Sequence, residues 1–203
     1  MIKIFFFINL IIIFPVKIRL SEFSQDCLIY NQKYSNKYLF ASNNIFTAGI
    51  INVQNPNHNV YSIPKESVDD FSKIKWTMEQ VNRPNSTLVT LKSNKGEYLC
   101  ASNEHHDLIQ HRRRIYLKSS IVKNRLITIT RNCEWRLEES FEKKIQTFII
   151  WNDLFNEPLY APSFFYKYNS IKRYIYSWKK KPTSNTEFKW SIDCNKRSVH
   201  SPN

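Results

Sequence analysis

The sequence predicts an all-β protein built from three similar units of four short strands each. Three observations predict this: short segments recur at nearly constant intervals, they are rich in β-branched and aromatic residues, and Asn, Ser and Pro fill the gaps between them. No stretch shows a convincing amphipathic helical period. With 42% hydrophobic residues, the chain can bury a sizeable core.

The first two strands of each predicted unit are a β-rich stretch and a segment centred on a Leu and an Ala. The stretches are 27–30, 87–91 and 147–151. The Leu-Ala segments are 38–42 (YLFAS), 98–102 (YLCAS) and 158–162 (PLYAP), which follow one another at intervals of 60 residues. This constant spacing predicts a structural repeat.

The last two strands of each unit carry a Tyr and a Trp. The Tyr segments are 60–63 (VYSI), 115–118 (IYLK) and 175–178 (IYSW), and the Trp segments are 75–79, 134–138 and 189–193. Apolar residues lie two positions from Trp76, Trp135 and Trp190, so we expect these three side chains in the core rather than on a sugar-binding surface.

Three units of four strands resemble the β-trefoil superfold, a barrel capped by hairpins, over Cys27 to Cys194. The resemblance implies a disulfide-stapled β-trefoil of three four-stranded repeats (about 27–80, 87–140 and 147–194), in a single domain over 22–194 with a tail at 195–203. The aromatic-basic run 173–178 (RYIYSW) and the Tyr-Leu-x-Ala segments resemble small secreted insect proteins.

Ricin-type lectins, which share the β-trefoil fold, carry a Gln-x-Trp motif. This chain departs from that pattern, because Ile74, Cys133 and Phe188 stand two residues before the three tryptophans. The departure puts a ricin-type sugar pocket in doubt.

The N-terminus has the pattern of a secretory signal. Lys3 precedes an apolar run over 4–16, broken only by Asn9 and Pro15, and Lys17 and Arg19 follow. A helix that crosses a bilayer needs about 20 residues, so a permanent anchor is the weaker interpretation. We expect a signal peptide over 1–21, cleaved between 17 and 24, and a secreted, extracellular protein. The glycosylation sequon at Asn85 agrees with secretion.

All four cysteines follow this segment, and an even number in an exported chain predicts two disulfides. The sequence alone permits three connectivities. The β-trefoil resemblance places the first and last strands side by side, which implies a bond between Cys27 and Cys194 and leaves Cys100 to pair with Cys133.

The chain is strongly basic, with 30 Lys and Arg against 17 Asp and Glu and a formal charge of +13. We expect the protein to bind an acidic polysaccharide or another extracellular polyanion, although a merely solvated charged surface has the same composition. The residues expected to bind are Arg112, Arg113, Arg114, Lys172, Arg173, Lys179, Lys180 and Lys181.

Several other functions have little support. With two glycines the chain cannot hold a Gly-rich phosphate loop, and no catalytic triad or carboxylate pair can be located. His105, His106 and His111 share one loop, but only Asp107 could complete a metal-binding set.

We therefore expect a monomeric, non-enzymatic binding protein without metal, cofactor or membrane span in its mature form. The alternative is a ligand for a protein partner, such as a protease inhibitor or a receptor-directed signal. The loops 52–58 and 179–185 are the candidates for its contact surface.

Overall fold

The computed structural model describes eleven stretches of the chain. They are 25–33, 37–45, 57–81, 86–106, 111–119, 121–123, 126–142, 145–162, 169, 171–179 and 186–194. The expected signal peptide, its cleavage site and the tail at 195–203 lie outside these residues.

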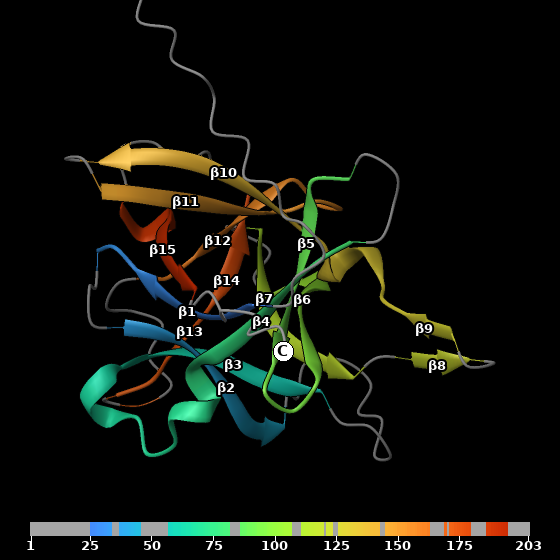
Figure 1. Cartoon of the computed structure of the whole chain (residues 1–203), viewed down its shortest axis with the longest axis horizontal. Helices are drawn as coiled ribbons and strands as arrows, with labels where there is room; N and C mark the ends of the chain where they lie inside the picture. The colour runs from blue at the N-terminus through green and yellow to red at the C-terminus, as the bar shows by residue number, and fades with distance from the viewer. Residues whose placement is uncertain are drawn as a thin grey trace, which may run out of the picture.

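The described residues form an all-β structure with a few short 3-10 turns, as predicted (Figure 1). One sheet has 13 strands and a second has two. The strands are β1 (Gln25–Asn31), β2 (Lys37–Ile45), β3 (His58–Pro64), β4 (Lys75–Gln80), β5 (Leu88–Ser93), β6 (Glu97–His105), β7 (Arg112–Ser119), β8 (Ile121–Lys123), β9 (Leu126–Thr128), β10 (Trp135–Glu142), β11 (Ile145–Asn152), β12 (Glu157–Tyr160), β13 (Arg173–Tyr174), β14 (Tyr176–Trp178) and β15 (Lys189–Cys194). The 3-10 turns are η1 (Lys65–Ser67), η2 (Phe71–Ile74), η3 (Arg131–Cys133) and η5 (Thr186–Phe188).

The large sheet closes on itself as a barrel. Ten strands form an unbroken ring of pairings, in the order β10, β11, β12, β14, β7, β3, β2, β1, β4 and β5, and β5 pairs with β10 again. The other three strands pair with members of this ring: β6 pairs with β5 and β7, β15 pairs with β1 and β11, and β13 pairs with β3. Closure leaves the ring without free edges, which would otherwise expose unpaired backbone groups.

The prediction of a β-trefoil of three four-stranded repeats is wrong, because the structure is a closed barrel of ten strands within one 13-stranded sheet. The predicted units hold unequal numbers of strands. The second contains the additional hairpin β8–β9, and in the third the expected strand 175–178 is replaced by β13 and β14. β13 pairs with β3, whereas β14 pairs with β12 and β7. Partners distant in sequence set these strand limits, and periodicity within the sequence does not report them.

The three tryptophans lie in the core, as predicted. Trp76, Trp135 and Trp190 are fully buried, at 0% exposure. Each indole N–H donates to a leucine carbonyl, at 3.0 Å to Leu39, 2.9 Å to Leu99 and 3.1 Å to Leu159. A buried indole needs such an acceptor, so these bonds tie β4, β10 and β15 to β2, β6 and β12.

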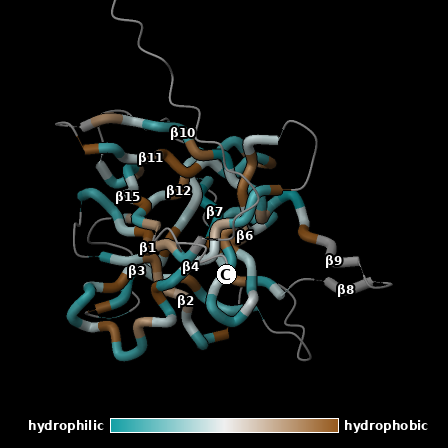
Figure 2. Tube along the Cα trace, viewed as in Figure 1, coloured by the Kyte–Doolittle hydropathy of each residue, from teal (hydrophilic) through white to brown (hydrophobic). Residues whose placement is uncertain are grey.

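Hydrophilic and hydrophobic residues both occur along the strands of the barrel (Figure 2). In β4, Trp76 and Met78 are buried while Lys75, Thr77 and Glu79 are more exposed. This period of two is the one expected for strands that bury one face.

Both disulfides join the expected pairs. Cys27 on β1 bonds to Cys194 on β15, its register neighbour, and Cys100 on β6 bonds to Cys133 in η3. Within the described stretches, no helix is long and apolar enough to span a bilayer.

Candidate functional site

The predicted arginine triplet opens β7, where it meets the third predicted unit. Arg112, Arg113 and Arg114 pair in register with Trp178, Ser177 and Tyr176 of β14. Because side chains alternate along a strand, Arg113 points to the opposite face from its two neighbours. Tertiary structure therefore gives the three arginines different surroundings.

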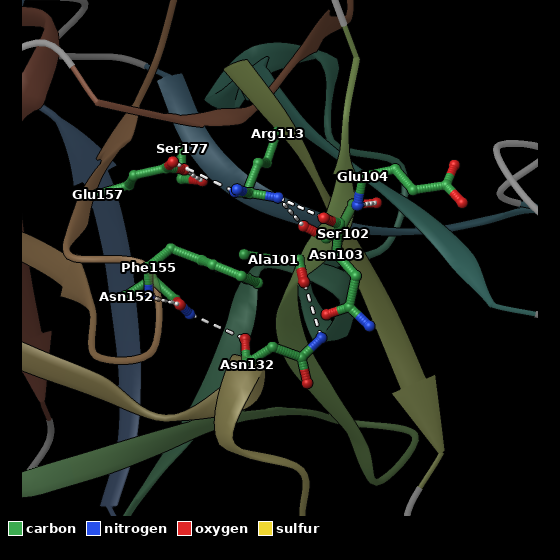
Figure 3. A network of polar contacts seen from close by, with 10 residues as sticks. All are labelled: Ala101, Ser102, Asn103, Glu104, Arg113, Asn132, Asn152, Phe155, Glu157 and Ser177. Atoms are coloured by element: carbon green, nitrogen blue, oxygen red, sulfur yellow. Dashed lines mark hydrogen bonds and ion pairs between the residues drawn. The ribbon is translucent and has the colours of Figure 1, made fainter. Parts of the chain in front are cut away.

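Arg113 makes several bonds within the protein (Figure 3). Its Nε donates to Glu157 Oε1 at 3.2 Å, and Nη1 donates to the carbonyl oxygens of Ser102, at 3.3 Å, and Asn103. The guanidinium also lies 3.9 Å from the Phe155 ring centroid. Ser177 Oγ donates to the other oxygen of Glu157 at 2.8 Å. These contacts indicate that Arg113 serves the fold rather than a ligand.

Arg112 and Arg114 lie against aromatic rings. The guanidinium carbon of Arg112 is 5.4 Å from the Tyr176 ring centroid and 5.8 Å from that of Trp178, and Arg112 is buried. The corresponding carbon of Arg114 is 4.0 Å from the Tyr174 centroid, and Nη2 donates to Asn59 Oδ1 at 2.9 Å. Arg114 remains half-buried and can reach solvent.

Lys172 has aromatic neighbours. Its Nζ is 5.4 Å from the Phe40 ring centroid and 6.0 Å from that of Tyr61. Among the described residues, no carboxylate forms an ion pair with Lys172 or with the exposed Lys179. An ammonium held by ring faces keeps its full positive charge toward an approaching anion.

Lys73 in η2 also lies near Phe40, with Nζ 5.9 Å from the ring centroid. Its charge is balanced, because Nζ is 3.6 Å from Asp69 and 4.0 Å from Asp70. Hydrogen bonds from the side chain and the backbone of Ser72 hold the pKa of Asp70 below its usual range. Asp70 therefore stays ionised, and the two carboxylates of Asp69 and Asp70 more than offset the positive charge of Lys73.

The accessible part of this region is here called the cation–aromatic surface. It consists of half-buried or exposed residues from β7, β13, β14 and their flanks, namely Arg114, Lys172, Tyr174, Trp178 and Lys179. The predicted binding residue Arg173 is half-buried and points to the opposite face of β13 from Tyr174. The ring centroids of Tyr174 and buried Tyr61 are 5.2 Å apart, and those of Trp178 and buried Tyr160 are 5.1 Å apart.

Sequence reasoning identified the basic residues of this surface but missed their aromatic partners. The alternation in 173–178 (RYIYSW) could have indicated them, because it places three rings on one face of an extended chain. Two other predicted binding residues, Lys180 and Lys181, lie outside the described residues, as do the predicted glycosylation site Asn85 and Asp107.

The three histidines are exposed and lie beside this surface. The ring centroids of His105 and His111 are 5.1 Å apart, and those of His106 and Tyr176 are 5.3 Å apart. Within the described part of the chain, no group of three or more His, Cys, Asp or Glu side chains could hold a metal ion.

Comparisons with known proteins show similarity at the level of structure. No protein family and no curated protein matches this sequence. A Culex salivary protein of the Cysteine and Tryptophan-Rich family matches with a TM-score of 0.53 and 17% identity, over 85% of this chain and 95% of that one. The designed 3-fold symmetric protein ThreeFoil matches with a TM-score of 0.55 and 11% identity, over 83% and 97% of the two chains.

The Polyporus squamosus lectin, crystallised with the epitope Neu5Aca2-6Galb1-4GlcNAc, matches with a TM-score of 0.51 and 15% identity. That match covers 85% of this chain and 50% of the lectin chain. At these identities the likeness shows a shared fold alone. The neighbours thus include a salivary protein and a lectin, and the two disulfides are typical of proteins from oxidising compartments.

Proposed function

We propose that this protein is a secreted, non-enzymatic binding protein that holds an acidic polysaccharide on its cation–aromatic surface. The observation that carries the proposal is the position of Lys172 over Phe40 and Tyr61, without an acidic partner among the described residues. Lys179, which is exposed, follows directly after β14. Lys172 and Lys179, which form no ion pair among the described residues, attract the sulfate and carboxylate groups of such a chain.

The structure changes which arginines support this function. Arg113 is balanced by Glu157 and bonded to two carbonyl groups, and Arg112 is 3% exposed. The expected contacts with the polysaccharide therefore come from Lys172 and Lys179, with Arg114 at their border. Tyr174 and Trp178 add half-buried rings, against which sugar faces can stack.

Two further observations support the proposal. The formal charge of +13 favours binding of polyanions in general. One structural neighbour, the Polyporus squamosus lectin, is bound to a Neu5Ac-containing epitope. The alternative of a protein-partner ligand stays a prediction, because most of the loops 52–58 and 179–185 lie outside the described residues.

The test compares two variants of equal charge. Lys172→Gln/Lys179→Gln removes two cations from the surface, and Lys75→Gln/Arg136→Gln removes two exposed cations from β4 and β10. Each protein is eluted with salt from immobilised heparin and from a sulfonate cation exchanger. Bulk charge contributes equally on both columns, so the difference between them reports specific binding.

We expect wild type and the control variant to elute from heparin at clearly higher salt than from the exchanger. The Lys172→Gln/Lys179→Gln protein should lose this difference. Equal elution of wild type from both columns, or equal behaviour of the two variants, would contradict the proposal.

A further inference from the structure

Three places in the barrel are equivalent by strand register. The pairs β2–β3, β6–β7 and β12–β14 place Leu39 opposite Ser62, Leu99 opposite Leu117 and Leu159 opposite Ser177. The carbonyls of these three leucines accept the three tryptophan N–H bonds, so the same position recurs three times.

Two further residues accompany each of these pairs. A neighbouring strand places Arg173 beside Ser62, His58 beside Leu117 and Arg113 beside Ser177. Lys37, Glu97 and Glu157 stand two residues before the three leucines, and so lie on the same face of their strands. The first site is then Glu157, Arg113 and Ser177; the second is Glu97, His58 and Leu117; the third is Lys37, Arg173 and Ser62.

In the first site both oxygens of the carboxylate have a hydrogen-bond partner. The Glu157 carboxylate accepts from Arg113 Nε at 3.2 Å and from Ser177 Oγ at 2.8 Å. Glu157 is 2% exposed, and its charge is compatible with burial because both oxygens are bonded.

The second site lacks one of these bonds. His58 Nδ1 lies 2.6 Å from Glu97 Oε1, but Oε2 is buried without a hydrogen-bond partner. Leu117 stands where the first site has Ser177 and offers no donor. In the second site, the carboxylate thus keeps one oxygen unbonded, because no hydroxyl donor stands at the position of Ser177.

In the third site the position of the glutamate carries the opposite charge. Lys37 replaces the glutamate, while Arg173 and Ser62 keep the cation and the hydroxyl of the first site. Ser62 is 1% exposed, and its Oγ is buried without a hydrogen-bond partner. Lys37 and Arg173 also take part in other contacts of the fold, so the open hydrogen-bonding position is the Ser62 hydroxyl.

We propose that the third site binds one oxyanion, a sulfate or carboxylate group of the acidic polysaccharide. The anion takes the place that the Glu157 carboxylate fills in the first site. Ser62 Oγ donates to it as Ser177 does to Glu157, Arg173 donates as Arg113 does, and Lys37 adds positive charge. The inference rests on the proposed function, and Arg173 directly follows Lys172 of the cation–aromatic surface in the sequence.

The test rebuilds the missing carboxylate. Lys37→Glu gives the third site the composition of the first, and Lys75→Glu makes the same charge change on exposed β4. Ser62→Ala removes only the buried hydroxyl, which keeps the test valid if Lys37→Glu does not fold. Melting temperature is measured while inorganic sulfate, or separately glucuronate, replaces chloride at constant ionic strength.

We expect a saturable rise of the melting temperature in wild type and Lys75→Glu with at least one of the two anions. The anion that produces it identifies sulfate or carboxylate as the bound group. Lys37→Glu should melt higher than Lys75→Glu without added anion and lose the saturable response. Ser62→Ala should weaken anion binding by about tenfold, the usual effect of one lost hydrogen bond to a charged group.

The absence of a saturable response in wild type, or an unchanged response in both Lys37→Glu and Ser62→Ala, would overturn the anion site. Heparin chromatography separates this result from the proposed function. Heparin-specific elution without a saturable anion response refutes the site alone. A saturable anion response without heparin-specific elution refutes the polysaccharide and leaves the site in place.

Discussion

Replacing Arg113 with methionine tests whether this arginine supports the fold. The substitution keeps an apolar stem of similar length but leaves Glu157, whose side chain is 3% exposed, with a hydrogen bond from Ser177 and no cation. Breaking a buried ion pair in this way costs about 3 to 5 kcal/mol. Because the Arg113 side chain is 12% exposed and partly screened by solvent, we expect the lower end, about 3 kcal/mol.

The assay is urea unfolding followed by tryptophan fluorescence. With a urea dependence of about 2 kcal/mol per molar, the unfolding midpoint should fall by roughly 1.5 M. Adding Glu157→Gln removes the isolated charge, so the double variant should recover about half of the loss. The non-additivity of the two substitutions then measures the coupling of the pair.

Arg136→Met is the matched control. Arg136 is exposed, its guanidinium carbon lies 5.6 Å from the Trp151 ring centroid, and Nη2 lies 3.3 Å from Asn156 Oδ1. We expect Arg136→Met to lower the free energy of unfolding by less than about 1 kcal/mol. An Arg113→Met protein within about 0.5 kcal/mol of wild type, or strict additivity with Glu157→Gln, would refute the structural role of this arginine.

Three further predictions concern stability. The Cys27–Cys194 bond spans 167 residues and the Cys100–Cys133 bond spans 33. Chain entropy therefore predicts that the free energy of unfolding falls by about 5 kcal/mol when the first pair is changed to serine and by about 4 kcal/mol when the second pair is changed. The urea midpoint should accordingly fall further for the first variant than for the second. Burial raises the pKa of Tyr116, so the neutral phenol contributes its full share of stability below about pH 10, and this share is lost as the pH rises further. The urea midpoint of wild type should therefore fall between about pH 9 and about pH 11, and Tyr116→Phe should make that fall smaller. Gly96 has a φ of +79°, so Gly96→Ala should lose about 1 kcal/mol in the same assay, and an unchanged midpoint would show that the turn relaxes.

Much of the local structure could be predicted from the sequence. β-branched and aromatic segments with polar gaps indicated strands, and Trp76, Trp135 and Trp190 are buried as expected. The number of strands was predicted wrongly for the second and third units. Residues 173–178 divide into β13 and β14 because two different distant strands, β3 and β7, pair with them. No pattern within the segment itself reports those partners.

The candidate site shows the same division. Composition indicated a basic region, but three consecutive arginines have three different environments, since strand alternation and the neighbouring β14 decide what each contacts. The buried hydroxyl of Ser62 and the reversed charge at Lys37 became informative only when strand register placed them beside the complete Glu157 site.

The sequence by itself determined the all-β class, the burial of the tryptophans and the excess of positive charge, because each depends on residue type and short-range spacing. The pairing of the cysteines followed from a resemblance and not from spacing. Tertiary structure decided how the barrel closes, which cations are neutralised and which remain available to a ligand. These properties depend on contacts between residues far apart in the chain, such as Arg113 with Glu157 and Lys172 with Phe40, and the free energy of those contacts depends on burial that only the folded chain creates.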